Sequence, residues 1–127
     1  MLEAPLPGGI GLSHIAAYDW ESADGVCSGS PHIHLACTEA YVVTGGEGAV
    51  QTLTPGDGFT ETPLEPGVIA WFTPGTVHRM VNGAGLRVTV LMQNSGLGNC
   101  VNALASLCVA SQIPMVALMV AYTMLSL

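Results

Sequence analysis

Residues 25–46 read GVCSGSPHIHLACTEAYVVTGG and contain a histidine pair, His32 and His34, followed by Glu39. In an extended strand alternate side chains share one face, so two histidines two positions apart can reach the same ion. Imidazole and carboxylate ligands together suit a borderline divalent metal, namely iron, manganese, nickel or zinc. The stretch therefore predicts a metal site carried by a β-strand.

A fourth candidate ligand lies further along the chain. Residues 67–82 read GVIAWFTPGTVHRMVN, in which a Pro74-Gly75 turn precedes His78. The turn would allow a second strand to begin close to the first one and bring His78 towards the pair. Glu39 has one alternative, because a slip of one residue in the strand would place Thr38 inward instead. Glu39 is preferred, since a carboxylate offers a metal a negative charge.

The rest of residues 1–98 has turn-forming residues spaced as in an all-β domain. Glycine and proline recur at short intervals, and the segments between them are short and rich in Val, Thr, Tyr and Phe. The predicted strands are 10–17, 31–37, 39–44, 48–53, 68–73, 78–82 and 86–93. Residues 45–48, Gly-Gly-Glu-Gly, are predicted as a hairpin turn. Strands of this length and spacing indicate a sandwich or a barrel.

Two motifs resemble those of the cupin family. Gly25–Gly46 is similar to the first cupin motif, G-x5-H-x-H-x3-4-E-x6-G, with one additional residue in the first spacer. Gly67–Asn82 is similar to the second, G-x5-P-x-G-x2-H-x3-N, with Thr73 in place of the proline. The resemblance implies an all-β jelly-roll barrel over residues 1–98, with His32, His34, Glu39 and His78 binding one divalent metal ion.

The resemblance also implies what the site would do. Four protein ligands leave about two positions open on an octahedral ion, which allows a small organic molecule or dioxygen to bind. We expect a metal-dependent enzyme, a dioxygenase-type oxidoreductase first and an isomerase or epimerase next. The alternative is a non-catalytic cupin that binds or senses a small ligand or a metal, because the fold hosts many functions. Metal-free cupins also exist, in which the same histidines act as acid/base groups or only line the pocket. Cupins also commonly form homodimers.

Several other residues are assigned from strand alternation. Side chains expected to line a substrate pocket, because they share a face with Glu39 or His78, are Tyr41, Val43, Met80 and Asn82. Arg79 alternates with His78 and is expected to point outward into solvent. His14 lies outside both motifs and is expected to be an ordinary histidine.

The charge and the cysteines limit the partners and the compartment. The formal net charge of −7 comes from nine acidic against two basic residues. Such a surface repels phosphate backbones, so a nucleic-acid partner is not expected. The four cysteines show no C-x-x-C spacing, and the first residues lack the pattern of a secretory leader. A cytoplasmic protein with free thiols is the default expectation.

The C-terminal segment, residues 99–127, differs in composition from the barrel. No charged residue occurs from Val88 to Leu127, and Ala103–Leu127 is apolar and long enough to span a bilayer as a helix. Three interpretations remain open: a membrane anchor, an apolar helix that packs on the domain or on a second subunit, or a sequence foreign to the domain. Contact with a membrane is expected only through residues 103–127.

Overall fold

The computed structural model describes residues 9–35 and 37–93, which form an all-β structure. The described strands are β1 (Ile10–Ala16), β2 (His32–Ile33), β3 (Glu39–Thr54), β4 (Gly58–Leu64), β5 (Ile69–Phe72) and β6 (Val77–Gln93). The predicted fold class is confirmed. The expectations for the tail, residues 99–127, concern a segment outside the described residues.

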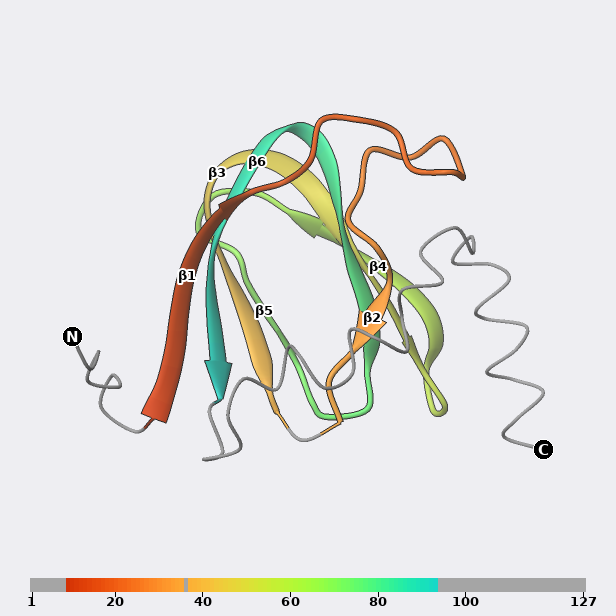
Figure 1. The fold of residues 1–127 in the computed structure, drawn as a ribbon, viewed down its shortest axis with the longest axis vertical. Helices are drawn as coiled ribbons and strands as arrows, with labels where there is room; N and C mark the ends of the chain where they lie inside the picture. Colours follow the sequence, from red (N-terminus) through yellow and green to blue (C-terminus); the bar gives the residue numbers. More distant parts are fainter. Residues whose placement is uncertain (1–8, 36, 94–127) are drawn as a thin grey trace.

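Two long strands, β3 and β6, pair with each other through a shared bend and build both halves of the barrel (Figure 1). In one half, the sheet order is β1, the end of β6, the start of β3, and β5. In the other half, the order is β2, the start of β6, the end of β3, and β4. The single hydrogen-bonded sheet therefore folds over on itself as a jelly roll.

The bend replaces the hairpin turn that was predicted at residues 45–48. β3 continues through this stretch, and its register with β6 shifts between Val43 and Gly45 and around Glu47. Gly46 has a φ of 68°, and a Cβ at this position would collide with the backbone of Gly85. A bulge with glycines lets two long strands turn a corner together without breaking their ladder. The same bend joins the two segments, 78–82 and 86–93, that were predicted as separate strands.

The remaining strand predictions differ from the structure at the sheet edges. β4 was not predicted, because its sequence, GFTETPL, is polar and contains a proline. Such a sequence is tolerated in β4 because β4 lies at the end of the strand order. The strand predicted at 31–37 is reduced to the two residues of β2.

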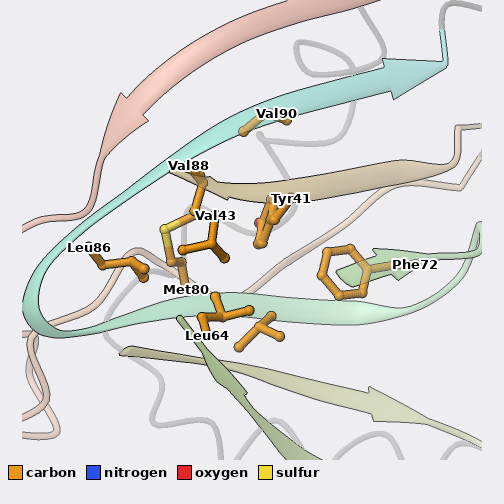
Figure 2. Close-up of a cluster of buried hydrophobic side chains, with 9 residues drawn as sticks. Tyr41, Val43, Leu64, Phe72, Met80, Leu86, Val88 and Val90 are labelled. Atoms are coloured by element: carbon orange, nitrogen blue, oxygen red, sulfur yellow. The ribbon is translucent and has the colours of Figure 1, made fainter. Parts of the chain in front are cut away.

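The core lies between the two halves of the barrel (Figure 2). The halves contribute side chains from β3, β4, β5 and β6 to one buried cluster. Its members are Tyr41, Val43, Val50, Leu64, Phe72, Met80, Leu86, Val88 and Val90. Burial of these apolar side chains stabilises the closed barrel and fixes the strands that carry the candidate ligands.

Two other expectations can be compared with the described residues. Cys27 is a free thiol, as expected, whereas Cys37 is disulfide-bonded, so the expectation of free thiols is wrong at that position. Within residues 9–35 and 37–93, no helix has the length and apolar character needed to cross a membrane.

The bend generates a prediction about Gly46. Gly46→Ala should lower the free energy of unfolding by about 2–4 kcal/mol, because alanine is strained at a positive φ and its Cβ would meet the Gly85 backbone. Gly45→Ala is the matched control, since a Cβ there would have no atom within 4 Å. Denaturant unfolding measures both variants. Equal stability of the two would contradict the proposed role of the bend.

Candidate metal centre

Three segments bring the four predicted ligands together. His32 on β2 is directly paired with His78 on β6, while Glu39 is the first residue of β3 and His34 follows β2. One ligand atom from each of the four residues lies within 4.8 Å of the others. His34, Glu39 and His78 are buried and His32 is half-buried. The predicted cluster is therefore present, with Glu39 rather than Thr38 facing the interior.

The Pro74-Gly75 turn positions two of the ligands. Gly75, with a φ of 87°, donates its backbone N–H to the carbonyl of His34 at 2.8 Å. The Thr76 N–H donates to the Thr73 carbonyl at 3.2 Å and closes the turn just before β6 begins. The turn thus fixes the backbone of His34 through this hydrogen bond and directly precedes the strand that carries His78.

Backbone carbonyls orient two of the imidazole rings. Nδ1 of His32 lies 3.0 Å from the Ser30 carbonyl, and Nδ1 of His78 lies 3.0 Å from the Thr76 carbonyl. A carbonyl only accepts hydrogen bonds, so Nδ1 carries the proton in both rings. Burial, and then repulsion from His78, lower the pKa of His32. Its Nε2 is therefore free to act as a ligand, in the manner of metal-bound histidines.

Glu39 supplies the negative charge of the site. Its Oε2 lies 2.7 Å from Nε2 of His78 and 3.1 Å from Nε2 of His34, and the residue is 5% exposed. Burial alone would raise the pKa of this carboxyl group, but its close contacts with His34 and His78, and the positive charge that these rings can carry, lower its pKa to about 2. The carboxylate is ionised at neutral pH and needs a cationic partner to offset its burial.

His34 shows that the cluster suits a metal ion. Neither of its ring nitrogens makes a hydrogen bond within the described part of the chain, although both are buried. Nε2 approaches Glu39 closely enough for an ion pair but without the alignment of a hydrogen bond. Buried polar nitrogens are rarely left without partners, because their desolvation costs about 1–3 kcal/mol. The lone pair of His34 and the Glu39 carboxylate fit a divalent cation held between them.

Aromatic side chains form the inner wall of the site. The Phe72 ring stacks on the His78 ring, with centroids 4.5 Å apart and an interplanar angle of 16°, and Tyr41 meets Phe72 edge to face at 5.0 Å. Burial and the nearby Glu39 charge raise the pKa of Tyr41, so its hydroxyl is neutral. The cluster of imidazoles and carboxylate thus has an apolar aromatic wall on the side of the barrel interior.

The residues predicted to line a substrate pocket fall into two groups. Tyr41, Val43 and Met80 point into the barrel and belong to the buried core. Asn82 lies at the bend instead, where its side chain accepts a hydrogen bond from the Leu86 N–H at 3.0 Å and donates one to the Tyr18 carbonyl at 3.0 Å. Alternation with His78 fails at Asn82 because the strand bends there and leaves backbone groups that the amide satisfies.

The position of Arg79 differs from the expectation of a solvated side chain. Arg79 faces away from the ligands, as alternation predicts, but it is only 4% exposed. Its guanidinium forms an ion pair with Asp24, with Nη1 to Oδ2 at 2.7 Å, and donates from Nε to the Gln51 side chain at 2.6 Å. The sequence held no local signal for this network, because its partners are 55 and 28 positions away. His14 is exposed and lies outside the site, as expected.

The chain belongs to the cupin family, whose model matches residues 16–124. This match includes most of the segment assigned above to the tail, and the boundary at residue 98 stays a prediction. No curated protein matches the chain.

Solved structures support the same fold. An uncharacterised protein with a double-stranded β-helix domain from Klebsiella pneumoniae is 20% identical, with a TM-score of 0.55 and 70% of each chain covered. The TDP-quinovose 3,4-ketoisomerase WlaRB from Campylobacter jejuni is 14% identical, with a TM-score of 0.54 over 71% of this chain and 66% of that one. At these identities the likeness concerns the fold alone.

The chain is shorter than some of its structural neighbours. The CENP-C cupin domain of Drosophila melanogaster is 18% identical with a TM-score of 0.49, and the match covers 68% of this chain but 59% of that one. The chain therefore spans less than two thirds of the length of that neighbour.

The ion pair of Arg79 generates a prediction about pH. Burial alone would raise the pKa of Asp24, but the hydrogen bond and charge of Arg79 and the Val26 N–H lower it below its ordinary 3.8. The stabilisation is therefore complete above pH 3.8 and is lost as pH falls through the lowered pKa. Asp24→Asn should cost about 1–3 kcal/mol near neutral pH and progressively less in acid.

Denaturant unfolding from neutral pH to about pH 2.5 measures this difference, with the exposed Asp19→Asn as the control. A deficit in Asp24→Asn that stays constant over the whole range would rule out the charged pair as its cause.

Proposed function

We propose that this cupin binds one divalent metal ion through His32, His34, Glu39 and His78. The observation that carries the proposal is the convergence of three imidazoles and one carboxylate within 4.8 Å, with both nitrogens of His34 buried and without hydrogen-bond partners. Iron, manganese, nickel and zinc all accept this donor set.

The arrangement around the ligands supports a metal more than a purely hydrogen-bonded cluster. Because Nδ1 of His78 gives its proton to the Thr76 carbonyl, a neutral His78 presents a lone pair to Glu39, which also carries lone pairs. Two groups of this kind lie 2.7 Å apart only when the histidine is cationic or when both face a cation. A divalent ion would satisfy His78, His34 and Glu39 together.

We further propose that the site acts on a small organic molecule and that its chemistry is of the dioxygenase type. Four protein donors would leave open positions on a bound ion, which supplies Lewis acidity and, with iron or manganese, redox chemistry. The apolar wall of Phe72 and Tyr41 would exclude water and bind the carbon skeleton of the molecule. Glu39 would offset part of the positive charge of the ion. The carbonyl groups of Ser30 and Thr76 would keep the rings of His32 and His78 in place.

An isomerase or epimerase is the second candidate, and the His78–Glu39 contact is the observation that favours it. In a metal-free site, a buried histidine 2.7 Å from a carboxylate can take up and return a proton at Nε2, the nitrogen that a metal would otherwise occupy. One fold neighbour, the Campylobacter ketoisomerase, performs chemistry of this class. A cupin that only binds or senses its ligand would have the same site without turnover.

Metal analysis tests the ligand set. Purified protein should contain close to one equivalent of metal, and a His32→Ala, His34→Ala double variant should lose it because half of the donors are removed. His14→Ala is the control, since His14 is an exposed histidine outside the cluster. Equal metal content in the double variant and the wild type would refute the site.

Activity measurements separate the reaction classes. Metal-loaded protein and metal-free protein are each mixed with a panel of small organic molecules while oxygen uptake and product spectra are recorded. Oxygen consumption that depends on the metal and is absent from the double variant supports the dioxygenase. Conversion without oxygen uptake supports the isomerase, and saturable binding without conversion supports the non-catalytic alternative.

A further inference from the structure

We propose that Arg79 is a positioning residue for the metal site, which holds the loop before β2 against β6 and so places His32 among the other ligands. The inference rests on the metal site proposed above. It assigns a role to the one buried arginine of the described chain, which the ligand set does not use.

The guanidinium of Arg79 joins the loop to the sheet. On the loop side, Nη1 of Arg79 donates hydrogen bonds to Oδ2 of Asp24 at 2.7 Å and to Oγ of Ser28 at 3.2 Å. From the sheet it contacts Gln51 Oε1 on β3, 2.6 Å from Nε. Gln51 is held in turn by Glu61 of β4 at 2.6 Å. A row of directly paired side chains thus fixes the arginine from one side, and the loop closes over it from the other.

The loop in turn fixes His32. β2 contains only two residues, so its own ladder gives it little support. The residues just before it are attached to β6 through the Gly29 N–H, which donates to the Met80 carbonyl at 3.1 Å, and through the Cys27 carbonyl, which accepts from Asn82 at 2.8 Å. The Ser30 carbonyl then orients the His32 ring. Ser28 lies between these two attachments, and Arg79 binds it.

The other ligands do not depend on this loop. Neighbouring side chains on a strand face opposite sides, so His78 points to the ligands while Arg79 points to the loop. His34 is held by the Gly75 N–H, and Glu39 begins a long strand that is paired on both sides. Loss of Arg79 should therefore displace His32 more than the remaining three ligands. Lysine would not replace it, because a single ammonium group lacks the planar fork that reaches Asp24 and Gln51 together.

Copper binding to the full chain tests the proposal. Wild type, Arg79→Met, Arg79→Lys, His32→Ala and Arg87→Met are loaded with Cu²⁺; affinity is measured by competition with a chelator, and pulsed EPR counts the coordinated imidazoles. We expect three imidazoles in the wild type and two in Arg79→Met, as in His32→Ala, with an affinity about tenfold lower or more. Arg79→Lys should resemble Arg79→Met.

Arg87→Met is the matched control, because it removes the same charge at an exposed position of β6. It should retain three imidazoles and the wild-type affinity. The proposal is overturned if Arg79→Met also retains three imidazoles and the wild-type affinity. It is likewise overturned if Arg79→Met and Arg87→Met lose affinity for Cu²⁺ equally. A role in stability alone would lower the unfolding free energy of Arg79→Met but leave three imidazoles on the metal.

Two further measurements keep the result decisive. Should Arg79→Met fail to fold, Asp24→Asn decides: two imidazoles support the proposal and three overturn it. Should the wild type bind no Cu²⁺, the proposed function fails, and the metal-free protein tests the positioning. Arg79→Met should then shift the imidazole ¹⁵N resonances of His32 but not those of His14. An unshifted His32 resonance overturns the proposal.

Discussion

The structure depends on the pairing of β3 with β6 along nearly their whole length. Because the two strands bend together, each contributes to both halves of the barrel, and the hydrogen-bonded ladder is shifted but not ended at the corner. The bend brings the backbones of Gly46 and Gly85 so close together that a Cβ on Gly46 would not fit. The core between the halves and the place of Glu39 and His78 both follow from this pairing.

Burial is the reason why the cluster of His32, His34, Glu39 and His78 would favour a cation. In water, a carboxylate and three imidazoles would be well solvated, but inside the barrel their polar atoms have each other and a few carbonyls as partners. The ionised Glu39 and the His34 nitrogens without hydrogen-bond partners therefore raise the free energy of the cluster, and a bound cation would lower it. On the opposite face of the same strands the buried charge is positive, and the cation of Arg79 is already neutralised by its ion pair with Asp24.

The clustering of His32, His34, Glu39 and His78 was predictable from the sequence, whereas the polar network behind these residues was not. His32 and His34 share a face by simple alternation, and the turn before His78 is a local signal. Glycine-rich residues 45–48 are equally typical of a hairpin and of a bulged bend, and only the pairing partner decides between them. Arg79 required knowledge of register, because Gln51 and Asp24 are distant in the chain. Asn82 was misplaced because alternation ends where β6 bends.

The spacing of the ligands along the chain has a consequence for folding. Glu39 and His78 are 39 positions apart, and they meet only after β6 has paired with β3. An unfolded chain therefore offers at most the local residues His32, His34 and Glu39 without His78, a weaker chelator than the assembled cluster. An ion held by all four groups would bind the native state selectively and add its binding free energy to that of folding. The resistance of this barrel to denaturation would then report the availability of metal in its surroundings.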